Sequence, residues 1–268
     1  MGNHVNTIKI ALAQTRIVWE DKETNLKRAQ MHVKEASDHG AHILFFPEMS
    51  FTGFSMHTKR TKEADQTTIE YMKSLAKTYQ MGIGFGWVKD CGVQCENHYT
   101  VIDSYGSTLS DYTKIHPFSY SGEDQYFRGG TALTNFAYNG IEISTFLCYD
   151  LRFPEIFQAA SKKAKVIVLA ANWPAQRHRH WNTLLRARAI ENQVYLLAVN
   201  CVGECGRIEY AGESCIINPD GCVQAYLSGQ EGIVYFDLLD DVQQFRDAFP
   251  IKQDRREPLY QQFMTQLT

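Results

Sequence analysis

Three side chains capable of catalysis each follow a segment that predicts a β-strand: Glu48, Lys114 and Cys148. Sites in open α/β sheets usually lie at the ends of strands. A carboxylate there can serve as a general base, and a cysteine can serve as a nucleophile if nearby positive charge or N–H groups stabilise its thiolate. Residue type alone leaves structural alternatives open, namely a helix-capping Glu48, a solvated Lys114 and an inert, buried Cys148.

Two weaker signals accompany these residues. Glu123 and Asp124 are adjacent acids, which ordinarily mark a solvated turn, and no histidine lies at metal-ligand spacing from them. Asn172 and Trp173 follow another apolar run. They could line a pocket, or they could form a loop whose indole fills the core.

The strands and helices that must position these side chains alternate along the chain. Strands are predicted over residues 8–13, 42–46, 82–88, 99–104, 108–114, 133–138, 141–147, 166–171, 194–200 and 232–238, with a further hairpin around 218–221. Helices are predicted over residues 25–37, 67–79, 154–161 and 178–193. A mixed sheet system covered by helices fits an α/β or α+β architecture. We expect one domain over residues 1–268, in which the residues after about 250 form a helical C-terminal tail.

Composition excludes several classes of protein. The 268 residues are 44% apolar and 21% charged, as in ordinary globular proteins rather than disordered ones. The net charge of −3 and the lack of a long basic run argue against a nucleic-acid partner. No apolar run approaches about 18 residues, and the first residues lack the form of a signal peptide. We therefore expect a cytoplasmic protein that does not bind membranes.

The seven cysteines are an odd number in a chain too long to need disulfides. Pairs separated by three residues, at 91 and 95 and at 201 and 205, do not match the usual spacing of zinc ligands. We therefore expect buried thiols or a nucleophile, and no metal site.

Taken together, the motifs resemble those of the nitrilase superfamily of carbon–nitrogen hydrolases. The matching stretches are Phe46-Pro47-Glu48, Lys114-x-His116 with Gly122-Glu123 following, Cys148-Tyr149-Asp150-Leu151-Arg152-Phe153-Pro154-Glu155, Ala171-Asn172-Trp173-Pro174, and His180-Trp181 through Asn192-Gln193. They occur in the family's order and the similarity covers nearly the whole chain. One departure is Pro117, where the family often has Leu, in the segment that leads to Glu123.

The resemblance implies a four-layer αββα sandwich, no metal or organic cofactor, and a homodimer or higher homo-oligomer. Within the superfamily, the Cys148 and Trp173 motifs look most like those of the omega-amidase group. That group hydrolyses the terminal amide of 2-oxoacid amides such as 2-oxoglutaramate, so we expect a small-molecule amide substrate. Two alternatives stay open: an amidohydrolase acting on carbamoyl amines or carbamoyl amino acids, and a catalytically silent interaction protein with the same fold.

The resemblance also implies a catalytic role for each central residue. Cys148 would attack the amide carbonyl, and Glu48 would take the thiol proton and return it to the leaving nitrogen. Lys114 and the backbone N–H of Tyr149 would stabilise the oxyanion. We expect Lys114 to lower the pKa of the Cys148 thiol and Glu48 to oppose that effect.

The remaining candidates would support this centre. Glu123 would be a second carboxylate that holds Lys114 or the substrate. Asn172 and Trp173 would bind substrate, and Arg177 could hold a substrate carboxylate through paired N–H donors. For Arg177 the alternative is a solvated side chain in a basic loop.

Overall fold

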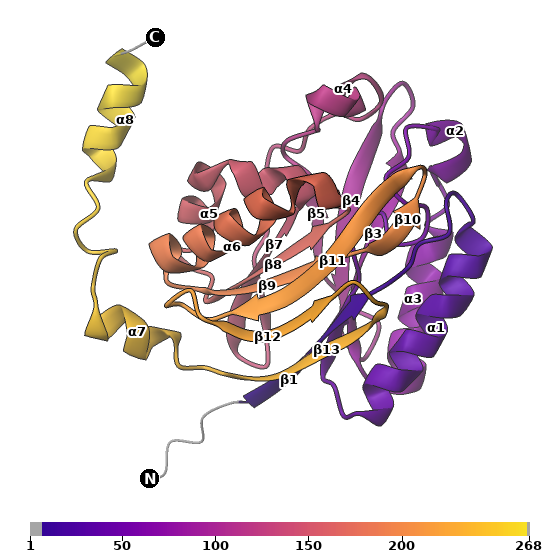
Figure 1. Ribbon diagram of the computed structural model, residues 1–268, viewed down its shortest axis with the longest axis horizontal. Helices are drawn as coiled ribbons and strands as arrows, with labels where there is room; N and C mark the ends of the chain where they lie inside the picture. Colours follow the sequence, from indigo (N-terminus) through magenta and orange to yellow (C-terminus); the bar gives the residue numbers. More distant parts are fainter. Residues whose placement is uncertain (1–6, 267–268) are drawn as a thin grey trace.

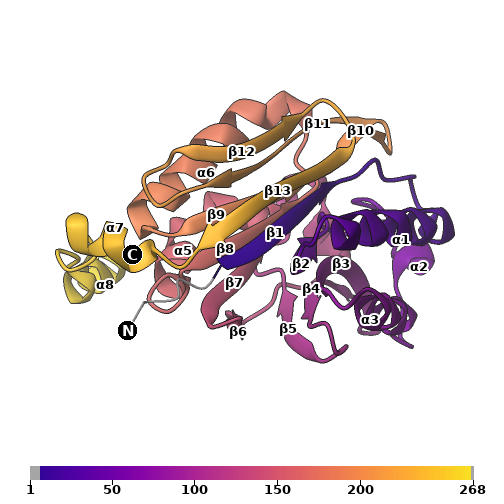
Figure 2. The ribbon, with the colours of Figure 1, turned by 90° about the horizontal axis from the view of Figure 1, so that it is seen from below.

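The computed structural model describes residues 7–266, in which two β-sheets pack face to face and helices cover their outer faces (Figures 1 and 2). The first sheet contains β1 (Thr7–Gln14), β2 (Ile43–Phe45), β3 (Gly82–Asp90), β4 (Cys95–Ile102), β5 (Thr108–Thr113) and β13 (Gly232–Leu239). Their order is β13-β1-β2-β3-β4-β5, with β1, β2 and β3 parallel and the outer strands antiparallel to their neighbours.

The second sheet contains β6 (Phe136–Tyr138), β7 (Ile141–Leu147), β8 (Val166–Ala171), β9 (Tyr195–Asn200), β10 (Val202–Cys205), β11 (Ile208–Ile217) and β12 (Val223–Ser228). Its order is β10-β11-β9-β8-β7-β6, and β12 pairs with β11. The central strands β7, β8 and β9 are parallel. The carboxyl ends of parallel strands meet at one edge of a sheet, so each sheet offers one such edge.

Helices α1 (Lys22–Asp38) and α3 (Thr67–Tyr79) cover the first sheet, and α5 (Pro154–Ala160) and α6 (His178–Asn192) cover the second (Figure 2). Short helices α2 (Thr58–Thr61) and α4 (Glu123–Tyr126) lie in connections. The last described helices are α7 (Val242–Ala248), whose first residue Val242 packs into the central core, and α8 (Glu257–Gln266), which stands apart from the sheets in Figure 1. The predicted αββα sandwich is confirmed. None of the helices in residues 7–266 is long and apolar enough to cross a membrane.

Strand alternation builds the layers. In β1, Ile8, Ile10 and Leu12 belong to the core between the sheets, whereas Ala11 and Ala13 face the helices of the first outer layer. Successive side chains of a strand point to opposite faces, so a strand buried on both sides reads as one continuous apolar run. β1 therefore contributes side chains both to the core between the sheets and to the face on which α1 and α3 pack.

Parts of the second sheet differ from the prediction. The strand expected over 133–138 is only Phe136–Tyr138, because it pairs with β7 only over these three residues at the sheet edge. The β10–β11 hairpin was not predicted, since Val202–Cys205 is short and contains a Gly-Glu pair that breaks the apolar pattern.

Candidate active site

The predicted site residues meet between the two sheets, at strand ends contributed by both. Glu48 follows β2 and Lys114 follows β5 in the first sheet, whereas Cys148 follows β7 and Asn172 follows β8 in the second. Glu48 and Lys114 are fully buried, and Cys148 is half-buried. Because the two sheets pack face to face, Glu48 and Lys114 from the first sheet lie close to Cys148 and Asn172 from the second.

A tight turn fixes Glu48. Met49 directly after it has a φ of +42°, a left-handed conformation that costs free energy for a residue with a Cβ. Ser50 ties this turn to β3, because its Oγ donates to the Pro47 carbonyl and accepts from the Gly86 N–H. A Cβ on Gly86 would lie 2.4 Å from the Met49 nitrogen, so only glycine allows this approach.

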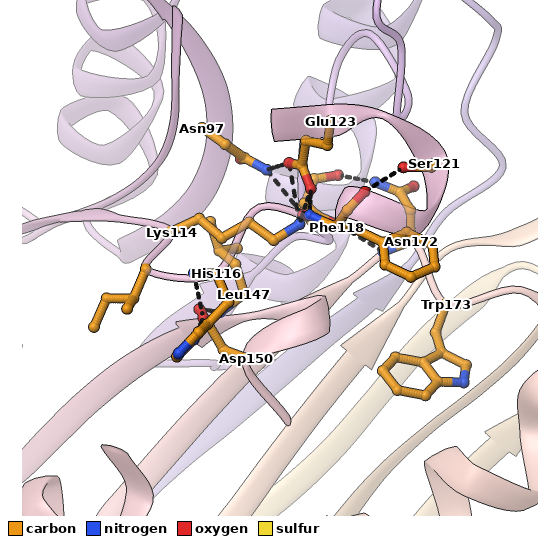
Figure 3. A network of polar contacts seen from close by, with 12 residues as sticks. Asn97, Lys114, His116, Phe118, Ser121, Glu123, Leu147, Asp150, Asn172 and Trp173 are labelled. Carbon is orange, nitrogen blue, oxygen red and sulfur yellow. Dashed lines mark hydrogen bonds and ion pairs between the residues drawn. The ribbon is translucent and has the colours of Figure 1, made fainter. Parts of the chain in front are cut away.

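Lys114 lies between the buried carboxylates of Glu48 and Glu123, and Figure 3 shows Lys114 beside Glu123. Its Nζ is 2.8 Å from Glu48 Oε1 and 2.8 Å from Glu123 Oε2. Asn97 Nδ2 reaches the same pair, at 2.9 Å from Glu48 Oε1 and 3.2 Å from Glu123 Oε1. Glu123 is the first residue of α4 rather than part of a solvated turn, and its carboxylate also accepts the Phe118 N–H. The segment after Pro117 therefore closes around Glu123.

Cys148 occupies a strained turn between β7 and α5. Its φ is +41°, and residues Cys148–Arg152 form a single 3₁₀ turn. The Asp150 carboxylate, which is fully buried, accepts the backbone N–H groups of Leu147 and His116, whose positions Figure 3 shows. It also accepts the Tyr112 hydroxyl. These bonds tie the nucleophile turn to β5 and to the segment after Lys114.

The charges of the site oppose one another. Burial and the negative charge of Glu48 raise the pKa of the Cys148 thiol well above its usual range, and the Lys114 charge offsets only part of this rise. Burial alone lowers the pKa of Lys114, but Glu123 and Glu48 outweigh burial and raise it. Both predicted influences on Cys148 are present, and their sum leaves a neutral thiol beside a cationic Lys114. A neutral thiol needs a base before it can attack, and Glu48 is the adjacent carboxylate.

A cavity of about 180 Å³ opens beside Cys148. Its walls are mainly aromatic, from Phe54, Phe118, Tyr120, Tyr149, Trp173 and Tyr210, with polar groups from Ser121, Arg152, Asn172 and Arg177. Pockets for drug-sized ligands usually measure about 300–1,000 Å³. The cavity therefore suits a smaller molecule with a few polar groups.

Comparison with known proteins identifies the family. Residues 9–247 match the family model described as carbon-nitrogen hydrolase. The chain belongs to the carbon–nitrogen hydrolase family. It is 34% identical over 258 residues to the 2-oxoglutaramate amidase of Bacillus subtilis (strain 168), which covers 94% of this chain and 98% of that protein. It is 30% identical over 253 residues to the omega-amidase YafV of Escherichia coli (strain K12), which covers 93% of this chain and 97% of that protein.

A solved structure agrees with this assignment. XC1258 from Xanthomonas campestris, a CN-hydrolase superfamily protein with an arsenic adduct in its active site, matches with a TM-score of 0.88 and 26% identity. The match covers 93% of this chain and 97% of that one. The predicted membership of the nitrilase superfamily is confirmed, and the chain is a carbon–nitrogen hydrolase.

Two arginines of this hydrolase line the cavity without a carboxylate partner among residues 7–266. The Arg177 guanidinium lies 5.3 Å from the Tyr120 ring centroid, and the Arg152 guanidinium lies 4.7 Å from that of Trp173. Arg152 also contacts His180 at 3.3 Å. Burial, together with the charge of Arg177, lowers the pKa of Arg152. Two neighbouring cations in an aromatic cavity form a receptor for an anion.

The other substrate-binding candidates also line the cavity. Trp173 does so while burying its indole in the core, where its Nε1 donates to the Arg177 carbonyl, so both interpretations of this residue apply. Asn172 donates its backbone N–H to Glu48 Oε2 and its side-chain amide to the Glu48 carbonyl. Its Oδ1 is buried and has no hydrogen-bond partner in the described part of the chain. Tyr149 adds its ring to the cavity wall.

Sequence reasoning assigned no role to Asn97, Arg152 or Tyr210. The strand predicted to begin at Tyr99 excluded Asn97, whereas β4 begins at Cys95 and sets Asn97 beside Lys114. The signal for Arg152 was its place in the Cys148 motif, four residues after the nucleophile on one 3₁₀ turn. Tyr210 belongs to the hairpin that was not predicted, and nothing local marks it.

Proposed function

We propose that the protein hydrolyses the terminal amide of a small 2-oxoacid amide such as 2-oxoglutaramate, through a thioester on Cys148 and with release of ammonia. One observation carries the proposal: the nucleophile and two arginines without carboxylate partners, Arg152 and Arg177, line the same small cavity. A substrate with an amide at one end and a carboxylate at the other matches that arrangement. The similarity to a 2-oxoglutaramate amidase and to an omega-amidase supports it.

In the first half of the reaction, Cys148 Sγ attacks the amide carbon while Glu48 takes the thiol proton. The carbon–nitrogen bond then breaks, the proton passes from Glu48 to the nitrogen, and ammonia leaves. In the second half, Glu48 removes a proton from water, which attacks the thioester. The carboxylic acid forms and the thiol regains its proton. The raised pKa of Cys148 supports a proton transfer during the attack.

Lys114 and the backbone N–H of Tyr149 stabilise the oxyanion formed by each attack. The Lys114 ammonium has three N–H bonds. One points to Glu48 and another to the Glu123 carboxylate, which leaves the third for the substrate oxygen. Donors of this kind are typically worth about 3–4 kcal/mol each in the transition state. Because Glu48 and Glu123 keep Lys114 charged, it donates throughout the cycle.

Arg152 and Arg177 hold the far carboxylate of the substrate, and the aromatic walls strengthen this interaction by excluding water. Trp173 supports Arg152 through contact with its indole face. Asn172 Oδ1, buried and without a partner among the described residues, accepts an N–H of the substrate amide. The amide is thus oriented toward Glu48 for protonation of its nitrogen.

The test is ammonia release from 2-oxoglutaramate by the wild type and by Cys148→Ala. We expect release by the wild type and none by the variant. Arg177→Ala and Arg152→Ala are each expected to raise KM at least about tenfold, since charged hydrogen bonds are worth about 1.5–3 kcal/mol. An unchanged KM in Arg177→Ala would remove the role given to that residue.

The arginines would also receive the carboxylate of an N-carbamoyl amino acid, and the same assay separates this second candidate. Only a carbamoyl substrate yields CO₂ together with ammonia. Release of both from an N-carbamoyl amino acid, without turnover of 2-oxoglutaramate, would select the carbamoyl reaction. No turnover of either substrate would favour a catalytically silent protein of this fold.

We also propose that the protein acts in the cytoplasm as a homodimer or higher homo-oligomer, with no nucleic-acid or membrane partner. All seven cysteines are free, as expected in a reducing compartment. Large apolar side chains remain exposed on α6 and α8, including Ile190, Phe263 and Met264. Light scattering on the purified protein tests the assembly: a mass of one chain, 30.7 kDa, would refute it.

A further inference from the structure

Among residues 7–266, Asn97 is the one uncharged side chain that hydrogen-bonds to both the Glu48 and the Glu123 carboxylate, and it is almost fully buried. It lies on β4 beside the end of β5, where its backbone carbonyl accepts the Lys114 N–H at 2.9 Å. The register pairs His98 with Thr113, so the next pair along is Asn97 with Lys114. Directly opposed residues in an antiparallel pair point to the same face, and both side chains therefore reach Glu48 and Glu123.

We propose that Asn97 is the positioning residue that keeps Glu48 and Glu123 ionised together and fixes which oxygen of Glu48 acts as the base. The inference rests on the proposed role of Glu48 as base, but not on the identity of the substrate. Asn97 is not among the residues that line the cavity, and its side-chain N–H bonds go to the two carboxylates, so it acts through them.

The first step of the argument is the balance of charge. Two buried carboxylates share a single cation, Lys114. Like charges at one buried site tend to retain a proton between them. Burial and the charge of Glu48 already raise the pKa of Glu123. Asn97 directs one N–H bond to each carboxylate, which favours the ionised form of both without adding a charge.

The second step is the choice of oxygen. Glu48 Oε1 accepts from Lys114 at 2.8 Å and from Asn97 at 2.9 Å. Glu48 Oε2 accepts one N–H from the described residues, that of Asn172 at 3.1 Å, and the Cys148 thiol also hydrogen-bonds to the Glu48 carboxylate. The less occupied oxygen, Oε2, therefore has a lone pair available for the thiol proton. Without Asn97 the carboxylate could rotate and lose this distinction.

The third step is the orientation of the amide. Asn97 Oδ1 is buried and has no hydrogen-bond partner among residues 7–266. Exchanging its oxygen and nitrogen would aim Oδ1 at two carboxylate oxygens, which are acceptors only when ionised. Leaving Oδ1 unpaired destabilises this orientation. The two hydrogen bonds to charged groups outweigh that cost, because each is stronger than a neutral hydrogen bond.

Two substitutions separate this role from simple packing. Asn97→Leu keeps the volume and removes both donors. Asn97→Asp keeps the shape but sets a third carboxylate against the first two. If Asn97 only fills space, the isosteric Asp variant will be the milder one. If it acts as a donor, Asn97→Asp will be at least as damaging as Asn97→Leu.

Infrared absorption of protonated carboxyl groups gives a readout that needs no substrate. We expect a protonated buried carboxyl near neutral pH in Asn97→Leu and none in the wild type, with the band lost in Asn97→Leu/Glu123→Gln if Glu123 holds the proton. The acid limb of kcat/KM for 2-oxoglutaramate is expected to rise by about one pH unit in Asn97→Leu, the shift expected when a charged hydrogen bond is lost.

Thr100→Val is the matched control on the same strand. Thr100 is fully buried and hydrogen-bonded to Trp87 and Asp111, away from the carboxylate pair. It is expected to lower Tm without a new carboxyl band or a shifted pH profile. The inference would be overturned if the infrared spectrum of Asn97→Leu showed no carboxyl band absent from the wild type. It would also be overturned if Asn97→Asp impaired the enzyme less than Asn97→Leu. If Asn97→Leu does not fold, the band and the acid limb of Asn97→Asp decide instead. A wild type that does not turn over 2-oxoglutaramate would refute the proposed substrate and leave the infrared test in force.

Discussion

Asp150 has no part in the proposed chemistry, yet replacing it with Asn is expected to destabilise the protein strongly. Its buried carboxylate accepts four hydrogen bonds, from the Tyr112 hydroxyl, the Leu147 N–H, the His116 N–H and the His116 ring at 2.8–3.1 Å. Each carboxylate oxygen faces one backbone N–H. An amide in either orientation would therefore aim its NH₂ at a backbone donor.

The cost can be worked out from these contacts. An unsatisfied buried backbone N–H costs about 1–3 kcal/mol, and the bonds that remain lose the extra strength conferred by a charged acceptor. Their sum is about 3–4 kcal/mol, a large part of the roughly 5–15 kcal/mol that stabilises a typical domain. For a chain of this size, about 1 kcal/mol shifts Tm by roughly 2–4 °C. We expect Asp150→Asn to lower Tm by about 6–15 °C.

Thermal unfolding followed by circular dichroism measures this shift, with two variants for comparison. Tyr112→Phe removes one of the four donors and is expected to cost about 1 kcal/mol. Asp124→Asn changes an exposed acid near the site and is expected to stay within about 0.5 kcal/mol of the wild type. A Tm for Asp150→Asn within 3 °C of the wild type, on the order of 1 kcal/mol, would refute the account of this network.

Three further predictions concern charge. Glu48→Gln is expected to abolish amide hydrolysis yet speed alkylation of Cys148 by iodoacetamide at neutral pH, because losing the Glu48 charge lowers the pKa of the thiol; alkylation slower than in the wild type would contradict this. Glu123→Gln is expected to keep more than about a tenth of kcat/KM, because Glu48 remains as base; a greater loss would give Glu123 an equal role. Although burial opposes it, contacts with α1 lower the pKa of Glu231 to about 2. A depressed carboxyl pKa stabilises the fold above the unfolded value of 4.5 and loses that contribution as pH falls toward 2. The Tm deficit of Glu231→Gln at pH 7 should therefore shrink at pH 3, and a constant deficit would argue against the linkage.

The elements that carry the site could be predicted because they are buried on both faces. The run before Glu48 is continuous and apolar, and the one before Cys148 ends in two apolar residues after an alternating start. The structure places β2 and β7 there, with boundaries within about one residue. The helix predicted over 67–79 has the bounds of α3. The secondary structure of such segments follows from their own residue pattern, whereas the packing of the two sheets depends on contacts between residues far apart in the sequence. The layered arrangement followed only from the family resemblance.

The residues that were not predicted are those whose importance comes from register. Asn97 lies in a polar stretch, Glu96 to His98, which gives no apolar alternation. Only the pairing of β4 with β5 sets it beside Lys114. The direction of the Cys148 pKa shift could not be predicted from neighbouring residues in the sequence either, because it depends on burial as well as on the surrounding charges. Residue types identify candidate catalytic groups, but the fold determines whether one group raises or lowers the pKa of another.

The same packing explains why a base is needed at all. A surface lysine beside a cysteine would favour the thiolate, but here Lys114 is already shared by Glu48 and Glu123. Its charge therefore stabilises two anions before it can stabilise a third. In the proposed mechanism the thiol stays neutral until a substrate carbonyl approaches, when Glu48 takes the proton and Lys114 gains a new oxyanion partner. Glu48, Lys114 and Glu123 are fully buried, so water does not screen their charges as it would at the surface.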